Sequence, residues 1–546
     1  MITGLAIENF KGIGERIELQ LRPLTLLFGA NSAGKSTVLH AILLAREIFE
    51  RRNANADVTV GGGTLVDLGG FRSFVHNHDC EREVRLGFTV DCDHLSEDFL
   101  APLEGIEEHL SILPDNFAVF STAELSVVLS WNRLLDRPFI SSFRLLGDGQ
   151  HFLNIDCDSS GNRVLMELNP HHPSLSLLRD WDSNYGNADQ GDMRGSEDSS
   201  VLAACLPAFA GLVQTVGDRQ FLLTHMLDPI PPHSGGLPFA YRDAESFRDS
   251  KNFDGEAEAR RFANAVAEGI SRLIQVPLRA LVDALSEFRY LGPLRTAPPR
   301  CYQAPNRPDP TRWSSGLGAW DILETADETF VNEVGRWLED EDRLNTGYRL
   351  RLKRFKELDM SNPLIIQLQT GRAFDEAEPG AVLDLSKLPT YCRLIILPPD
   401  ELVELRPNDV GIGISQVLPV IVTALDGQSR TIAIEQPELH IHPRLQAEIA
   451  DLFVEAIATN RHRFIIETHS EHLILRLLRR IRETESGKAP ESRRLRTDSL
   501  GIYYLKQEGR TTRASRIDVD VKGEFIQPWP DDFFEIDFFE RFPDAR

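Results

Sequence analysis

The sequence lacks the marks of an exported, membrane-spanning or disulfide-bonded protein. Its six cysteines include no CxxC pair, which fits reduced thiols better than a disulfide framework or a zinc site. It has no run of eighteen apolar residues, so we predict no transmembrane helix. The opening segment MITGLAIENFKGI has no basic region followed by an apolar stretch, as a signal peptide would. We therefore expect a cytoplasmic protein without a structural metal.

The chain also has fewer basic than acidic residues. The chain has 59 Lys and Arg residues against 83 Asp and Glu residues, a formal net charge of −24. An acidic field repels nucleic acid unless a basic patch is locally concentrated, so any contact with nucleic acid must be local or depend on a partner. The hydrophobic fraction of 42% is ordinary, and 546 residues are more than one hydrophobic core usually serves. We expect more than one domain.

The N-terminal residues carry strand and helix signals on either side of a glycine-rich loop. Residues 5–10 and 17–21 are predicted strands, and 24–28 is predicted to be a buried strand. A helix with apolar residues at helical spacing follows over 35–50. Between residues 84 and 168, short alternating stretches separated by turn residues predict an antiparallel meander.

Polar and proline-rich runs divide the middle of the chain, and they bracket helical patterns over 202–227 and 257–288. We predict a mostly helical insertion there. From residue 393 onward, strands and helices alternate, as they do in the βα units of a parallel sheet. The strand-like segments are 394–397, 431–434, 464–467, 501–505 and 517–521, and helices are predicted after GIGIS, over 443–457 and after residue 469.

The segment from Gly29 to Thr37, GANSAGKST, fits the pattern GxxxxGK[ST] and lies between a predicted strand and a predicted helix. Its glycines let backbone N–H groups wrap the β-phosphate of a nucleotide, and the helix dipole favours the negative charge. Lys35 is predicted to reach the β- and γ-phosphates, and the Ser36 hydroxyl to ligate Mg²⁺. The predicted nucleotide contacts are Asn31, Ser32, Ala33, Gly34, Lys35, Ser36 and Thr37, with Thr37 at the α-phosphate.

A second part of the site lies far downstream. Residues 431–435, TIAIE, form an apolar strand that ends in a carboxylate, the Walker B arrangement that holds Mg²⁺. The continuation QPELHIHP resembles the EEPEAHLHP pattern of bacterial ABC-like ATPases related to the Overcoming-Lysogenization-Defect proteins. That resemblance makes Glu435 the acid on the metal side of the site.

Gln436 stands where such ATPases have a glutamate that activates the attacking water. A carboxamide orients water by hydrogen bonding but does not take up its proton. Two outcomes are therefore open: hydrolysis is slow, or Glu438 serves as the base in place of the missing carboxylate.

Three further segments resemble this lineage. His469, in Thr-His-Ser after a predicted strand, is similar to the switch histidine of ABC ATPases, which hydrogen-bonds the γ-phosphate. Ser415, in GIGISQ before an apolar helix, is similar to the signature serine that meets the γ-phosphate bound by a partner subunit. The opening AIENFKGI resembles the first strand of RecF and SMC heads. The alternatives are a core histidine at position 469 and a flexible turn at GIGIS.

Other segments have two interpretations. The arginines of RYLGPLRTAPPR (Arg289, Arg295 and Arg300) either touch phosphate or a neighbouring subunit, or form salt bridges within this acidic protein. His440 and His442 alternate faces in an extended chain and lack a cysteine partner, which disfavours zinc. The aromatic residues near the C-terminus are core anchors or a docking patch for a partner: Trp529, Phe533, Phe534, Phe538 and Phe539.

The resemblance implies an α/β fold: an AAA-type, P-loop ABC-type ATPase head with an antiparallel β-subdomain and a large, mostly helical insertion. ATP is expected to lie between the P-loop of one protomer and Ser415 of another, so a homodimer is the smallest functional unit. The expected domains are 1–95 and 391–495 for the head, 96–170 for the β-subdomain, 171–390 for the insertion, and 496–546 for a small C-terminal domain in place of the Toprim nuclease of some relatives.

Relatives with this architecture act in bacterial defence against phage, for example as the ATPase components of Septu and retron systems, where a separate nuclease does the damage. The resemblance therefore implies an ATPase with ATP and Mg²⁺ as cofactors, which acts as a nucleotide-gated sensor or scaffold for an effector nuclease or toxin. The alternative is a DNA-repair ATPase like RecF that acts directly on DNA. A transporter subunit is disfavoured because the sequence LSGGQ is absent.

Overall fold

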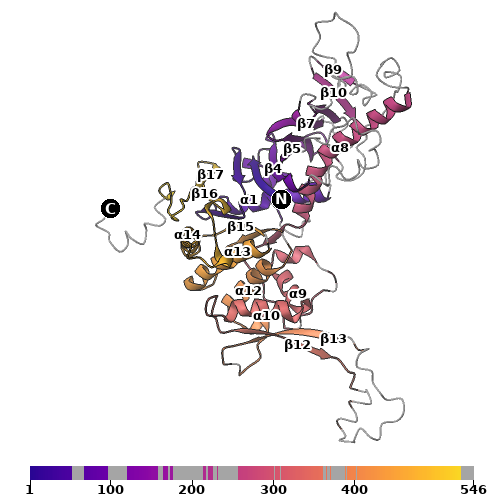
Figure 1. Cartoon of the computed structure of the whole chain (residues 1–546). Coiled ribbons are helices and arrows are strands. Elements are labelled where there is room, and N and C mark those ends of the chain that lie inside the picture. Colours follow the sequence, from indigo (N-terminus) through magenta and orange to yellow (C-terminus); the bar gives the residue numbers. More distant parts are fainter. Residues whose placement is uncertain are drawn as a thin grey trace, which may run out of the picture.

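Three β-sheets and the helices around them make up the fold (Figure 1). No helix in the described residues is long and apolar enough to span a bilayer. The computed structural model describes residues 1–51, 67–95, 120–157, 164–169, 172–175, 213–216, 219–224, 230–231, 256–300, 302–305, 307, 309–360, 365, 369, 388, 390–400, 402–428, 430–460 and 462–530.

The central sheet has six strands. β15 (Arg463–Glu467) lies between β14 (Thr431–Glu435) and β3 (Leu24–Gly29) and runs parallel to both. All six residues of β3 are buried, as expected where both faces of a sheet are covered. The register places Glu435 beside Glu467, so the carboxyl ends of these strands meet at one edge. The full order is β11 (Arg289–Leu291), β14, β15, β3, β16 (Leu500–Glu508) and β17 (Thr511–Ile517), with β17 antiparallel to β16.

Helices cover both faces of the central sheet. Alternate residues of β14 and β15 face two separate hydrophobic cores, with Ala433 and Ile465 in one and Ile432 and Ile466 in the other. Side chains of α1 and α8 fill the first core, and those of α12, α13 and α14 fill the second. The bounds are α1 (Lys35–Arg51), α8 (Glu256–Ser286), α12 (Ile412–Leu425), α13 (Pro443–Asn460) and α14 (Glu471–Glu485).

The nine-stranded sheet is antiparallel, and the meander predicted over 84–168 is confirmed within it. The helix predicted over 257–288 is confirmed as α8. The helix predicted over 202–227 is wrong where the structure describes that segment, because VQTV and RQFLLT are rich in strand formers and pair at the sheet edge. The strands are β1 (Ile2–Glu8), β2 (Ile17–Gln20), β4 (Val84–Asp91), β5 (Thr122–Asn132), β6 (Arg137–Gly147), β7 (Gln150–Cys157), β8 (Val164–Leu168), β9 (Val213–Val216) and β10 (Arg219–Thr224).

A two-stranded hairpin is separate from both larger sheets. β13 (Thr390–Leu397) contains the strand predicted at 394–397, but it pairs antiparallel with β12 (Arg349–Lys356). The prediction that this strand belongs to the parallel βα core is therefore wrong, since a short apolar run does not reveal which sheet it joins. The hairpin packs on α10 (Glu328–Glu339) and α9 (Leu317–Thr325), at the end of the molecule opposite to β9 and β10 (Figure 1).

The C-terminal strands extend the central sheet. The strand predicted at 501–505 is confirmed within β16, whereas β17 ends at Ile517, where the last predicted strand was expected to begin. Trp529 is a core anchor that meets Phe28 edge to face, and the other aromatic residues predicted beside it lie outside the described residues. The division into domains stays a prediction. The short helices are α3 (Phe71–Phe74) and 3-10 turns at His76–His78, Asp93–Leu95, Pro173–Leu175, Pro310–Trp313, Pro407–Asp409, Glu491–Arg493 and Thr497–Ser499.

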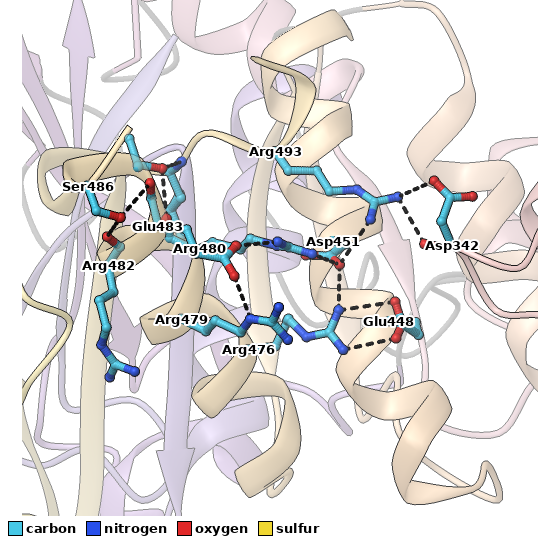
Figure 2. A network of polar contacts seen from close by, with 12 residues as sticks. Asp342, Glu448, Asp451, Arg476, Arg479, Arg480, Arg482, Glu483, Ser486 and Arg493 are labelled. Atoms are coloured by element: carbon cyan, nitrogen blue, oxygen red, sulfur yellow. Dashed lines mark hydrogen bonds and ion pairs between the residues drawn. The ribbon is translucent and has the colours of Figure 1, made fainter. Parts of the chain in front are cut away.

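An ion-pair network joins the two helices that follow β14 and β15 (Figure 2). Asp451 of α13 is 1% exposed, and its carboxylate accepts hydrogen bonds from Arg480 at 2.6 Å and from Arg476 at 2.7 Å, both on α14. Glu448 pairs with Arg476 at 2.9 Å, and Arg493 lies 3.7 Å from Asp451. Because α13 and α14 begin shortly after the two strands end, this network fixes the loops that carry polar residues at the sheet edge.

Candidate nucleotide-binding site

The glycine-rich loop connects β3 to α1, as the sequence predicts. Gly29 has a φ of 144°, and a Cβ there would lie 2.1 Å from the carbonyl oxygen of Leu505 in β16. Gly34 has a φ of 96°, and a Cβ there would lie 2.7 Å from the hydroxyl oxygen of Thr512. Both positions therefore require glycine. The loop curls at the edge where β3, β14 and β15 end.

The other loop residues divide by exposure. Asn31 and Ser32 are exposed, and Ser32 has a left-handed φ of 62°. Ala33 and Thr37 are buried against the start of α1. The polar side chains and the left-handed turn of the backbone therefore face solvent, and the buried residues anchor the loop to α1. This arrangement suits a phosphate-binding loop. Their individual contacts with a nucleotide stay a prediction.

Lys35 is buried inside the loop, where it is 3% exposed. Its ammonium donates hydrogen bonds to the carbonyl oxygens of Gly29 at 3.1 Å and Ala30 at 2.8 Å, and it lies 3.9 Å from a carboxylate oxygen of Glu467. Burial lowers the pKa of Lys35, and the carboxylates of Glu467, Glu438 and Glu435 oppose that shift. A cation is thereby held in the concavity that the loop backbone forms.

Two carboxylates flank the Ser36 hydroxyl. It lies 2.7 Å from an oxygen of Glu467 and 3.4 Å from an oxygen of Glu435, and it donates to these acceptors. The second oxygen of Glu435 accepts a hydrogen bond from the Tyr290 hydroxyl at 2.7 Å. Burial raises the pKa of Glu467 to about 7, and the neighbouring Glu435 adds to the shift. Burial likewise raises the pKa of Glu435.

The oxygen atoms at this point fit a magnesium ion. Mg²⁺ prefers carboxylate, hydroxyl, phosphate and water oxygens, and it is usually held by one or two protein ligands together with the substrate phosphates. Ser36 and Glu435 provide two such oxygens side by side. In the described part of the chain, no group of three or more His, Cys, Asp or Glu side chains is arranged to hold a metal. The nucleotide and water would have to complete the coordination.

The backbone after β14 makes a strained turn that Arg295 supports. Gln436 has a left-handed φ of 44°, and its N–H donates to the carbonyl oxygen of Glu467 at 2.7 Å. Arg295 is 3% exposed and donates to the carbonyl oxygens of Glu435 at 2.6 Å and Gln436 at 3.2 Å. The amide of Gln416 in α12 donates to the Arg295 carbonyl at 2.6 Å, so this arginine ties the turn to α12.

The other two arginines of this segment form salt bridges, as one of the two interpretations predicted. Arg289 pairs with Asp426 at 2.6 Å, and Arg300 pairs with Asp409 at 2.6 Å. Arg289 also lies over the Trp313 ring, 3.7 Å from its centroid. These contacts hold β11 and the segment after it against the head.

Glu438 and His469 meet at the end of β15. The Glu438 carboxylate accepts hydrogen bonds from the Thr468 hydroxyl at 2.9 Å and from the His469 backbone N–H at 2.6 Å. Burial raises the pKa of Glu438. The Nε2 atom of His469 is buried and has no hydrogen-bond partner within the described residues, and burial together with Lys35 lowers the pKa of the imidazole.

Ser415 lies elsewhere on the head, in the first turn of α12. Its hydroxyl donates to the carbonyl oxygen of Ile412 at 2.9 Å, and Ile412 itself is 58% exposed. None of the hydrogen bonds found in the described residues joins Ser415 to the P-loop of the same chain. The structure thus brings Lys35, Ser36 and the acids together without this serine.

Sequence reasoning missed Glu467 and Tyr290. Glu467 ends a buried apolar strand in the same way as Glu435, so the signal that identified Glu435 was also present at Glu467. Tyr290 could not be found in this way, because it lies in β11 and reaches Glu435 only through the parallel pairing of β11 with β14.

The fold and the site together define the class of protein. A glycine-rich loop follows a buried parallel strand and opens a helix, and a second parallel strand ends in an acid beside the loop's serine. An antiparallel sheet contains the N-terminal strands, and the helices α8, α9 and α10 lie between residues 256 and 339. The chain has the α/β fold of a P-loop ABC-type ATPase head, and the expected fold class is confirmed.

One family model matches part of the chain. Residues 299–476 match the model of a family described as "AAA domain, putative AbiEii toxin, Type IV TA system", a segment that contains Glu435 and His469 but not the P-loop. No curated protein matches the chain.

Among solved structures, the chain is similar to SMC heads. One is the SMC head bound to the C-terminal winged-helix domain of ScpA, with 10% identity over 95% of this chain and 98% of that chain, at a TM-score of 0.36. A second is the head with an extended coiled coil bound to the C-terminal domain of ScpA, derived from Pyrococcus furiosus, with 10% identity, 95% and 96% coverage and a TM-score of 0.35. A third is the SMC head from Thermotoga maritima, with 9% identity, 95% and 99% coverage and a TM-score of 0.33.

Proposed function

We propose that this protein binds and hydrolyses ATP with Mg²⁺, that two heads close around the bound nucleotide, and that closure controls a separate effector. The observation that carries the proposal is the convergence of Lys35, Ser36, Glu435 and Glu467 at one edge of the central sheet. A buried cation, a hydroxyl and two carboxylates at the mouth of a glycine-rich loop form the polar set that phosphoryl transfer uses.

Each residue has a role that follows from its position. When ATP binds, its phosphates take the place of the Gly29 and Ala30 carbonyls as partners of Lys35. Ser36 and Glu435 hold Mg²⁺, which neutralises charge on the phosphates when it is bound. The His469 Nε2 atom, which has no partner in the described structure, is placed to hydrogen-bond the terminal phosphate.

Glu467 acts as the general base in ATP hydrolysis. Gln436 lacks a carboxylate, and both oxygens of Glu438 already accept hydrogen bonds that hold the turn before His469. Glu467 is the carboxylate nearest to Ser36, 2.7 Å from its hydroxyl oxygen, and a carboxylate at this edge of the loop can accept a proton from the attacking water. Glu438 then acts by positioning His469.

Dimerisation is supported by the place of Ser415. The serine stands in the first turn of α12, where the positive end of the helix dipole favours an anion. Closing two copies head to tail around two nucleotides would place this turn over the partner's phosphates, and the exposed Ile412 beside it would become covered.

The effector role takes its support from the family comparison. The family matched over 299–476 is described as an AAA domain and putative AbiEii toxin of a Type IV toxin–antitoxin system. We propose a nucleotide-gated sensor or scaffold in anti-phage defence, with a nuclease or toxin as its separate partner.

Replacing Lys35 by alanine should weaken ATP binding by about tenfold to a hundredfold, because charge-assisted hydrogen bonds contribute about 1.5–3 kcal/mol. Fluorescence of a labelled ATP analogue with Mg²⁺ measures this affinity. The matched control is Lys488→Ala, which removes an exposed lysine away from the site and should leave the affinity unchanged. Absence of ATP binding by the unaltered protein would refute the proposal.

Dimerisation has its own test. Light scattering after size exclusion should show that ATP doubles the mass of a hydrolysis-deficient protein, and that Ile412→Arg abolishes the doubling by placing a bulky charged side chain in the interface beside Ser415. ATP binding to the Ile412→Arg monomer should persist. A mass that does not respond to ATP would contradict head closure but not nucleotide binding.

A further inference from the structure

The β12–β13 hairpin concentrates positive charge in a protein that is otherwise acidic. Five of the eight residues of β12, RLRLKRFK, are basic, and neither β12 nor β13 contains an acidic residue. The whole chain has a formal charge of −24. The hairpin lies beyond α10, far from the central sheet and its P-loop (Figure 1). A local basic element of this kind meets the condition under which an acidic protein binds an anionic polymer.

The two faces of the hairpin differ. Leu350, Leu394 and Ile396 share one face and join the hydrophobic core under α10. Because side chains alternate along a strand, Arg351 and Lys353 lie on the opposite face, and both are exposed. Ile395 and Leu397 share this second face but are buried, and we call its remaining part, with Arg351, Lys353 and Phe355 of β12 and Tyr391 and Arg393 of β13, the outward face.

Like charges face each other on the outward face. Lys353 and Arg393 are directly paired across the two strands, an arrangement that disfavours pairing unless a counter-charge is present. Among the described residues, Arg349 pairs with Glu339 at 2.6 Å, Lys353 reaches the exposed Glu404 at 3.1 Å, and Arg393 lies over the Phe355 ring, 4.7 Å from its centroid. Arg351 forms no ion pair with any described residue. The face therefore has positive charge left for an external anion.

Aromatic rings accompany the cations. Phe355 and Tyr391 are directly paired across the strands and stack at 5.8 Å between ring centroids with an interplanar angle of 26°. Both are partly exposed. Rows of cations with interleaved aromatic rings are the surface that binds single-stranded nucleic acid, because the cations follow the phosphates and the rings stack on bases.

We propose that the outward face of the β12–β13 hairpin binds single-stranded nucleic acid. Arg351, Lys353 and Arg393 contact the phosphate backbone, and the Phe355–Tyr391 pair supports a base. Binding of this kind tolerates many sequences, since every base has a face that stacks. The site is separate from the P-loop, so it does not depend on ATP hydrolysis.

Fluorescence anisotropy with labelled single-stranded DNA, single-stranded RNA and duplex DNA tests the proposal on the full chain. The double variant Arg351→Glu, Lys353→Glu should weaken single-strand binding by at least about tenfold, and the slope of log affinity against log salt should become shallower by about 1.4. The matched control is Arg133→Glu, Arg137→Glu, two exposed arginines at the β5–β6 turn, which should leave affinity and slope unchanged. The melting temperature of each variant checks its fold.

Phe355→Leu separates stacking from charge. It should weaken single-strand binding by about tenfold and leave duplex binding unchanged, because bases in a duplex are not free to stack on the ring. Comparison of the DNA and RNA arms identifies which strand is preferred. The proposal fails if the unaltered protein binds no oligonucleotide, if the control variant loses as much affinity as the hairpin variant, or if vesicles of anionic lipid bind the hairpin and oligonucleotides do not.

Discussion

Replacing Glu467 by glutamine should lower the rate constant of ATP hydrolysis by about 10²–10⁴-fold, the usual contribution of a general base. The carboxamide keeps the hydrogen bond from Ser36 but cannot accept a proton from water. ATP affinity should change by no more than a few-fold, because Lys35 and the loop backbone remain. Phosphate release at saturating ATP, together with binding of a fluorescent ATP analogue, measures the two quantities separately.

Glu438→Gln is the matched control for this experiment, since it makes the same chemical change on a neighbouring carboxylate. The amide oxygen still accepts one of the two hydrogen bonds from Thr468 and His469, so we expect a smaller loss of hydrolysis than for Glu467→Gln. The reverse order of effects would make Glu438 the base, which the sequence leaves open. Gln436→Glu offers a further check, because a carboxylate at the usual position should raise turnover if water binds there.

Removal of Asp451 should have the largest effect on stability. Asp451→Ala should lower the free energy of unfolding by about 1.5–3 kcal/mol, because Arg476 and Arg480 lose their shared buried partner and keep only Glu448 and Glu483. Urea titration followed by circular dichroism measures the loss. The loops before α13 and α14 should also loosen, so ATP binding should weaken in parallel.

An exposed pair of the same chemistry provides the control. Arg496 and Asp498 lie 3.3 Å apart with side chains 77% and 56% exposed, and Asp498→Ala should cost no more than about 1 kcal/mol. Equal losses for the two aspartates would show that the network in Figure 2 contributes no more than a surface pair does.

Local signals in the sequence were enough to predict the strands of the parallel core. β3, β14 and β15 are short apolar runs followed by polar loop residues, and the P-loop pattern fixed where β3 ends and α1 begins. The meander and α8 followed from periodicity and turn residues, whereas the fold class followed from the resemblance carried by the P-loop and Walker B segments. The functional roles of Gln436, Glu438, His469 and Ser415 stay predictions.

Long-range pairing explains what the sequence could not predict. The segments that form β9 and β10, VQTV and RQFLLT, are strands because β10 pairs with the edge strand β8. Nothing within those residues identifies β8 as the partner. The same holds for β13, which was expected in the core and pairs with β12 instead. The charge of Arg295 predicted either a contact with phosphate or a neighbouring subunit, or a salt bridge. In the structure Arg295 donates to the backbone carbonyl oxygens of Glu435 and Gln436, which only the folded chain brings close to it.

The position of β16 beside β3 has a consequence for synthesis. β16 pairs in parallel with the strand that leads into the P-loop, the Leu505 carbonyl closes against Gly29, and Thr512 donates its N–H to the carbonyl oxygen of Gly12 at 2.8 Å. A nascent chain that has not yet released these residues from the ribosome leaves one side of β3 as an open edge. The P-loop is therefore translated well before the strand that packs against it. A translation product that ends before β16 leaves this side of the loop without its support.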